Sequence, residues 1–281
     1  MPRSPESTFR ARLITAALLL AGFIAAVLLL DRVPFTVLAG VVVALAAYEW
    51  AKLCKFRDAP AIGYSGMAVV LFAVLNLWLF PVSAAERPEA VVFVLALAFW
   101  ALAVPVWLFR GVDRSGPGLV PAAGLAVILP AALAMVALSP VRLLLVLALV
   151  WIADTAAYLA GKAFGRHKLA PSISPGKTWE GVAGAMAGSL AYAGACAALV
   201  PSLRETIGDS FMWWAVYLTG AAILCGVSVL GDLFESAIKR HASVKDSGTL
   251  LPGHGGILDR IDSATAALPV AALMFQGLNP T

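Results

Sequence analysis

The sequence has little charge for its length. Only 13% of its 281 residues are Asp, Glu, Lys or Arg, whereas 61% are hydrophobic. Average soluble domains contain about 25% charged residues and about 45–50% apolar residues. This composition excludes an intrinsically disordered chain, and it exceeds what one soluble hydrophobic core can bury. It therefore indicates a polytopic membrane protein.

Cysteine and linker-like segments are also scarce. The three cysteines, Cys54, Cys196 and Cys225, are far apart and form no C-x-x-C pair. This spacing excludes a zinc site built on paired cysteines and a disulfide framework. The chain has no Pro- or Ser-rich linker and no long polar insertion, so nothing in it predicts a second domain.

Long apolar stretches dominate what remains, and each is close to the roughly 20 residues that cross a bilayer as a helix. We predict an all-α membrane protein with about nine transmembrane helices. The predicted spans are residues 13–30, 33–50, 61–82, 90–109, 119–138, 141–161, 179–201, 211–231 and 258–278.

Basic residues divide unevenly between the two sides of this nine-span arrangement. Four of the 20 Lys and Arg residues fall on one side, namely Arg32, Arg87, Arg142 and Arg204, and the other sixteen fall on the side of the N-terminus. Basic residues are retained in cytoplasmic loops. We therefore predict a cytoplasmic N-terminus and an external C-terminus.

The polar residues that could take part in catalysis or binding are concentrated in three segments of residues 151–262. The first contains Asp154, inside the predicted span 141–161. A carboxylate there costs about 2.5–3.5 kcal/mol on insertion scales, and such residues are generally functional. The alternative is a hydrogen bond that serves helix packing.

The second segment, residues 165–181, contains Gly-Lys-Thr at 176–178. A Walker A loop would require a glycine at position 171, which is Pro171, so that motif is excluded. We instead predict a helix that begins with Ser174 as N-cap and Pro175 as first residue. Its free N–H groups, beside Lys177, would form an anion site. The alternative is a basic loop that sets topology and contacts anionic lipid.

The third segment, residues 231–263, is the richest in charge. If 232–241 is helical, then Asp232, Glu235 and Lys239 share one face. Asp259 and Asp262 have i, i+3 spacing at the start of the last span. Carboxylates from neighbouring helices suit magnesium, which prefers oxygen ligands. The alternative is a solvated loop of mixed charge.

Clustered carboxylates beside clustered cations indicate phosphoryl or nucleotidyl transfer, because metal ions, Lys and Arg neutralise charge that develops on phosphate oxygens. In the predicted topology, these segments reach the cytoplasmic face. A site there meets a soluble nucleotide from one side and a lipid from the other. The residues alone name neither substrate.

These segments resemble the phosphatidate cytidylyltransferases, also called CDP-diacylglycerol synthases. The resemblance rests on SAIKR at 236–240, KDSG at 245–248 and LPGHGGILDRID at 251–262, preceded by DTAAY at 154–158, SPGKTWEG at 174–181 and GDLFES at 231–236. Residues 1–150 are similar only in being apolar. The resemblance implies N-terminal membrane helices in 1–150 and a catalytic membrane region in 151–281, together forming one structural unit.

The resemblance also implies the reaction of CTP with phosphatidate to give CDP-diacylglycerol and pyrophosphate, with Mg²⁺ and also K⁺. It implies Asp232 and Asp259 as metal ligands. It places Lys239, Lys245 and Asp246 in the catalytic group, and Ser174, Lys177, Glu180, Arg240, His254 and Arg260 near the nucleotide. Asp154, Glu235 and Asp262 are weaker candidates. Further expectations are a homodimer, no nucleic-acid partner and a place in the bacterial inner membrane, with the site facing the cytoplasm.

Two other classes remain open at this point. One is a lipid kinase or a related nucleotidyl-transferring membrane enzyme, which comparison of CTP with ATP would distinguish. The other is a transporter that uses Asp154 as an ion site. A paired broken helix in the first half of the chain would favour a transporter, and the sequence contains none.

The predicted topology is testable by cysteine labelling. In a variant without the native cysteines, we expect Asn279→Cys to react with a membrane-impermeant thiol reagent applied from outside the cell. Labelling from the cytoplasmic side alone would contradict the topology.

Overall fold

The computed structural model describes residues 5–80, 88–112, 116, 118–250 and 255–277. Its helices are α1 (Pro5–Leu29), α2 (Arg32–Leu53), α3 (Asp58–Leu79), α4 (Glu89–Ala98), the π-helical turn η1 (Phe99–Ala103), α5 (Val104–Arg110), α6 (Leu119–Ala137), α7 (Pro140–Phe164), α8 (Trp179–Leu199), α9 (Pro201–Ile207), α10 (Phe211–His241) and α11 (Leu258–Gly277). Two strands, β1 (Lys168–Ala170) and β2 (Ser174–Thr178), form an antiparallel hairpin.

Seven helices in the described residues are long and apolar enough to cross a membrane: α2, α3, the continuous α4–η1–α5 segment, α6, α7, α8 and α10. The predicted all-α membrane architecture is confirmed to this extent, with the small hairpin as an addition. The count of nine is not confirmed. Among the residues whose side chains are described, α1 contributes the apolar stretch Ala17–Leu29, and α11 is absent from these seven helices.

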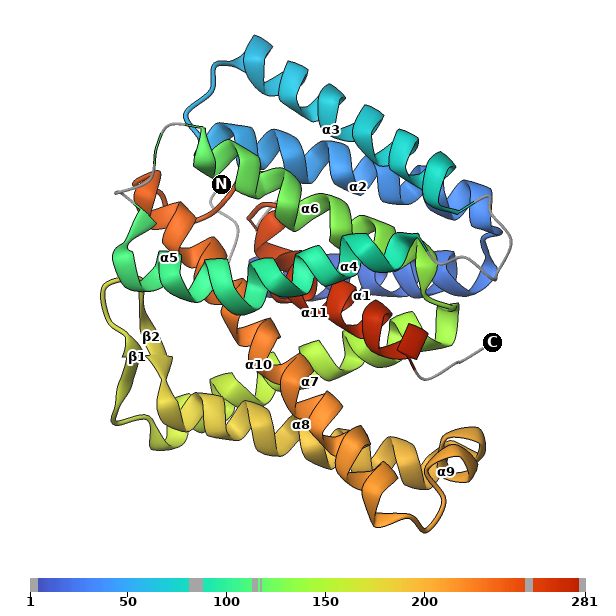
Figure 1. Cartoon of the computed structure of the whole chain (residues 1–281). Helices are drawn as coiled ribbons and strands as arrows, with labels where there is room; N and C mark the ends of the chain where they lie inside the picture. The colour runs from blue at the N-terminus through green and yellow to red at the C-terminus, as the bar shows by residue number, and fades with distance from the viewer. Residues whose placement is uncertain (1–4, 81–87, 113–115, 117, 251–254, 278–281) are drawn as a thin grey trace.

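Figure 1 shows α2, α3 and α6 on one side of the bundle and α7 and α8 on the other, with α10 running diagonally across the bundle. Helices α10 and α11 lie between these groups, and α4 crosses in front. The hydrophobic core draws on both halves of the chain, and it includes Trp50, Leu133, Phe234 and Leu258.

The β-hairpin marks one end of the bundle, which we call the hairpin end. This end also carries the C-terminal turn of α2 and the first turn of α11, because Glu49 accepts hydrogen bonds from the backbone of Ile257 and Leu258. At the opposite end, Arg32 and Arg142 line one cavity with Gln276, near the end of α11. Arg32 and Arg142, two of the four arginines that are predicted to lie on the external side, are therefore at the same end of the bundle.

Helix α11 carries Asp259, Arg260 and Asp262 in its first two turns, yet it lies in the middle of the bundle. Its next turns are buried, from Ser263 to Ala272, so neighbouring helices shield it from lipid. Gly231 permits its close approach to α10, since a Cβ at that position would stand 2.6 Å from the carbonyl oxygen of Asp262.

The predicted helix start at Ser174 is wrong. Residues Ser174–Thr178 form strand β2, and α8 begins at Trp179, with Thr178 Oγ1 accepting a hydrogen bond of 3.1 Å from Gly181 N. Proline disfavours the α conformation in the residue before it, and an N-cap is also extended. The Ser-Pro pair therefore fits a strand as well as a helix start, and Thr178 supplies the cap.

Candidate active site

Acidic and basic side chains meet at the hairpin end, on the last turns of α10 and the first turns of α11. Helix α10 presents Asp232, Glu235 and Lys239 there, as their i, i+3 and i+7 spacing predicts. Helix α11 brings Asp259 and Asp262 to the same place. The predicted convergence of carboxylates from both ends of the 242–257 loop is therefore found.

Lys239 connects the two helices. Its Nζ atom lies 2.6 Å from Oε2 of Glu235 and 2.7 Å from Oδ1 of Asp259. All three side chains are largely buried, with exposed fractions of 11%, 4% and 9%. Removing one member of such a group leaves an uncompensated charge, which typically costs 3–5 kcal/mol. This arrangement fixes α10 against α11.

The second oxygen of Asp259 holds the loop that precedes it. Oδ2 accepts hydrogen bonds from the backbone N–H of Ser247 at 2.9 Å and of Gly256 at 2.8 Å, and it lies 3.1 Å from Ser247 Oγ. Both oxygens of Asp259 therefore have protein partners. In this arrangement Asp259 organises the loop and Lys239.

Glu49 of α2 is the residue that the sequence reasoning missed. It is 2% exposed, and its carboxylate accepts hydrogen bonds of 2.9 Å from Ser247 Oγ, Ile257 N and Leu258 N. It thus satisfies N–H groups at the start of α11. A Cβ at position 256 would collide with Glu49 and Ser247, so this contact requires Gly256. A lone acid within the predicted span 33–50 was the available signal.

Lys177 reaches the site from strand β2. Its Nζ atom lies 2.6 Å from Oδ2 of Asp232, and both side chains are partly exposed. The predicted position beside the N–H groups of a helix that begins at Ser174 is therefore wrong. Lys177 instead attaches the hairpin to α10 through a buried Nζ atom.

Asp154 and Asp262 extend the acidic group. Ser263 Oγ donates a hydrogen bond of 3.3 Å to Asp154, and Asp262 is close enough to Asp154, Asp232 and Glu235 for electrostatic interaction. Within the described part of the chain, no Lys or Arg forms an ion pair with Asp262. The site therefore has more negative than positive charge.

The remaining predicted residues lie around this centre or outside it. Arg240 donates to the carbonyl oxygens of Ile173 and Val244 and so links the hairpin turn to the loop. Glu180 binds His167 at 2.6 Å, within the hairpin region. Ser174 begins strand β2, and Lys245, Asp246 and Arg260 are exposed. His254 lies outside the described residues.

A hard divalent cation fits this group of donors. Glu235 Oε1 is buried and accepts no hydrogen bond from the described residues. Asp232 and Asp262 are close enough to interact electrostatically, and Oδ2 of Asp232 contacts Lys177. No group of three or more His, Cys, Asp or Glu in the described residues has the arrangement of a complete metal site. Magnesium, however, is generally held by one or two carboxylates together with substrate phosphates and water.

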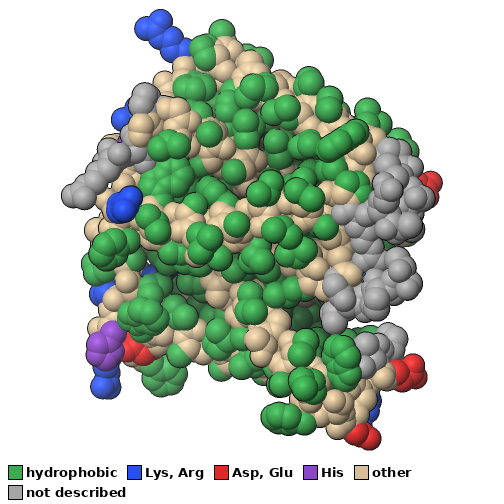
Figure 2. Space-filling model, viewed as in Figure 1, with side chains coloured by type: hydrophobic (Ala, Val, Ile, Leu, Met, Phe, Trp, Pro, Cys, Tyr) green, Lys and Arg blue, Asp and Glu red, His purple; other side chains and the backbone are tan. Residues whose placement is uncertain are grey.

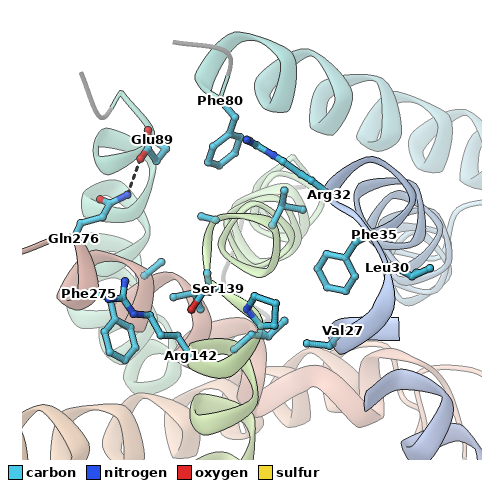
Figure 3. Close-up of a pocket in the computed structure, with 16 residues that line it drawn as sticks. Val27, Leu30, Arg32, Phe35, Phe80, Glu89, Ser139, Arg142, Phe275 and Gln276 are labelled. Atoms are coloured by element: carbon cyan, nitrogen blue, oxygen red, sulfur yellow. Dashed lines mark hydrogen bonds between the residues drawn. The ribbon is translucent and has the colours of Figure 1, made fainter. Parts of the chain in front are cut away.

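A cavity at the opposite end of the bundle is the other concave candidate (Figure 3). It has a volume of about 500 Å³. The guanidinium of Arg32 lies over Phe80 and that of Arg142 over Phe275, each 5.1 Å from the ring centroid. Gln276 donates a hydrogen bond to Glu89 there. None of the predicted catalytic residues lines this cavity, so we assign the active site to the hairpin end.

Comparison with known proteins identifies the family of this chain. The model of the cytidylyltransferase family matches residues 10–278, nearly the whole chain. The chain belongs to the cytidylyltransferase family. The resemblance read from the sequence motifs is thereby confirmed.

Individual relatives agree with this assignment. A phosphatidate cytidylyltransferase of Pseudomonas aeruginosa is 40% identical over 280 residues, which cover 94% of this chain and 95% of the relative. One of Haemophilus influenzae is 33% identical, covering 92% and 95%. A third, from Staphylococcus epidermidis, is 44% identical over 126 residues, 45% of each chain. The first two matches extend the similarity over the N-terminal half.

The role of Glu49 in the loop leads to a prediction. Glu49→Gln retains the size of the side chain, but only one oxygen of an amide can accept the N–H donors of Ile257 and Leu258. Hydrogen bonds to charged groups contribute about 1.5–3 kcal/mol. We therefore expect hydrogen exchange at these two amides to accelerate by roughly tenfold to a hundredfold, measured by mass spectrometry on the purified protein.

Glu89→Gln is the matched control, because Glu89 is a partly buried acid at the opposite end. It should leave exchange at Ile257 and Leu258 unchanged. Equal protection of these amides in the wild type and in Glu49→Gln would show that the carboxylate does not hold the loop.

Proposed function

We propose that the protein transfers the cytidylyl group of CTP to phosphatidate, giving CDP-diacylglycerol and pyrophosphate, at the hairpin end of the bundle. The observation that carries this proposal is the meeting of Lys177, Lys239 and five carboxylates at the hairpin end, in a chain whose relatives are named phosphatidate cytidylyltransferases.

In the reaction, an oxygen of the lipid phosphomonoester attacks the α-phosphorus of CTP. A new P–O bond forms, the bond between the α-phosphorus and its bridging oxygen breaks, and pyrophosphate leaves with the electron pair. The attacking group is already largely ionised at pH 7, because the second pKa of a phosphomonoester is near 6. No general base is then required.

The chain's own task is to bring two anions together. Lys177, which contacts the partly exposed Asp232, and the exposed Arg240 are the cations that would neutralise phosphate oxygens of the nucleotide. Lys239 is buried between Glu235 and Asp259. It holds α10 and α11 in register, and it keeps the carboxylates of both helices directed at one point.

Magnesium fits the acidic group, and we propose Asp232 and Asp262 as its protein ligands, with Glu235 Oε1 beside them. Asp259 is the less suitable of the predicted pair, because Lys239 and the loop amides hold both of its oxygens, whereas Lys177 contacts only Oδ2 of Asp232. When bound, the ion neutralises negative charge on the phosphates. Potassium and a homodimer stay predictions.

The site would face the cytoplasm of a bacterial inner membrane, the compartment that supplies CTP. The bacterial relatives and the concentration of basic residues on this side support that placement. The two other classes named above predict different results in the following assay.

The direct test uses purified protein in detergent micelles with phosphatidate, Mg²⁺ and either radiolabelled CTP or radiolabelled ATP. We expect a CDP-lipid from CTP and no labelled lipid from ATP. Transfer of phosphate from ATP would indicate a lipid kinase. The proposal would be contradicted if no labelled lipid forms although a thermal unfolding transition shows that the protein is folded.

Lys177 gives a specific prediction for nucleotide binding. Lys177→Ala removes a cation whose charge-assisted contact with phosphate contributes about 1.5–3 kcal/mol, so kcat/KM for CTP should fall by roughly tenfold to a hundredfold. Lys168→Ala is the control, since Lys168 is an exposed lysine in the partner strand. An unchanged KM and kcat for CTP in Lys177→Ala would assign Lys177 a purely structural or topological role.

Magnesium titrations distinguish the two proposed sets of ligands. Asp262→Asn should raise the Mg²⁺ concentration for half-maximal activity by roughly tenfold or more, the scale on which changes around a metal alter its affinity. Asp259→Asn should lower the maximal rate without moving that midpoint. The reverse result would restore Asp259 as the ligand and remove Asp262.

A further inference from the structure

An apolar groove opens on the side of the bundle, between the η1–α5 segment and α6. Its volume is about 740 Å³, within the range of about 300–1,000 Å³ typical of ligand sites. Small side chains create the space. Ala98 and Ala103 line one wall, and Ala122, Ala123 and Ala126 line the other.

The groove is accessible from the hydrocarbon layer. Leu102, Val106 and Leu119 on its rim are 68%, 49% and 56% exposed. Figure 2 shows hydrophobic side chains along this face of the molecule, over α4, α5 and α6. A surface of this kind on a membrane-spanning bundle is in contact with lipid chains or with another membrane protein.

Charge is present at one place in the groove. Among the described lining residues, Arg110 alone is charged, and it is the last residue of α5. This position is at the hairpin end, since the adjacent start of α6 binds Trp50 through the carbonyl oxygen of Val120. The groove therefore pairs an apolar channel with a cation at the level of lipid headgroups. This combination is complementary to an anionic lipid.

The wall of the groove packs against α10, the helix that carries Asp232, Glu235 and Lys239. Phe99 and Trp107 line the groove, and their rings lie 5.9 Å and 5.5 Å from the ring of Phe234. Phe234 is on α10, directly before Glu235. The π-helical turn that supplies Phe99 is a type of distortion often found at functional sites. The groove wall thus packs against α10 at the residue before Glu235.

We propose that this groove binds an acyl chain of the phosphatidate substrate, with Arg110 contacting its phosphate before the reaction. This inference rests on the proposed function and adds where the lipid enters. It commits to a lipid because the groove holds a single cation at headgroup level and no acid among its described lining residues. A second copy of the chain would make this surface an interface, and that outcome is part of the test.

The test compares dioleoyl and dihexanoyl phosphatidate in the CTP assay. Ala103→Phe fills the groove, and we expect its kcat/KM for the dioleoyl lipid to fall about tenfold or more, because two displaced methylene groups already have an effect of that size. The value for the dihexanoyl lipid should change less than about twofold, since a chain of six carbons needs little of the groove. The KM for CTP should not change.

Ala101→Phe is the matched control, because Ala101 is exposed on the same π-helical turn but does not line the groove. It should leave both lipids unaffected. Arg110→Gln should raise the KM for both lipids, since both carry the phosphate. Arg57→Gln removes another exposed basic residue near the hairpin end and should raise neither KM.

The outcomes separate this inference from the proposed function. If the wild type is active and Ala103→Phe changes kcat/KM equally for both lipids, the groove is not an acyl-chain site, and the proposed reaction is unaffected. A change in oligomeric mass in Ala103→Phe, measured by light scattering, would make the groove a protein interface and also overturn the proposal. A wild type without CTP-dependent product would instead remove the proposed function.

Discussion

The contact of Lys239 with Glu235 and Asp259 is the constraint on which the rest of the site depends. It joins α10 to α11 through charges that are almost entirely removed from solvent. Such a contact stabilises little by itself, because desolvation opposes the Coulomb attraction. Its value lies in specificity, since any sliding of one helix against the other would leave a buried charge without its partner. It therefore fixes the position of every carboxylate on these two helices.

Hydrogen bonds to charged acceptors fix the loop that lies next to this contact. Asp259 holds the N–H groups of Ser247 and Gly256, and Glu49 holds those of Ile257 and Leu258. The loop before α11 is thus anchored by acids from two helices that are about 200 residues apart in sequence. This explains why the N-terminal half, which contributes few polar residues, is required for the geometry of the site.

The arrangement also explains how strongly polar helices exist inside a membrane-spanning bundle. Glu49 is buried against the start of α11, and Asp262 lies on α11, which packs against α10, α6, α4 and α7. Asp154, on α7, is exposed and accepts a hydrogen bond from Ser263. Polar groups inside a membrane protein are tolerated where they face other helices or an aqueous cavity. The active site and the apolar groove therefore differ in the chemistry of their side chains. Lys177 and Asp232 form a charged, partly exposed pair at the active site, whereas the groove beside Arg110 is lined mainly by apolar side chains.

Much of this was determined by the sequence alone, because apolar periodicity, helical spacing and motif order are local properties. They predicted an all-helical membrane protein, the shared face of Asp232, Glu235 and Lys239, and the family. Where local rules allow two answers, they failed: the Ser174-Pro175 pair is compatible with a strand as well as a helix start. Tertiary structure alone decided that Lys177 meets Asp232, that both oxygens of Asp259 are occupied, and that Glu49 anchors the loop. These facts depend on contacts between segments far apart in the chain, and no local pattern encodes which distant carboxylate reaches a given N–H group.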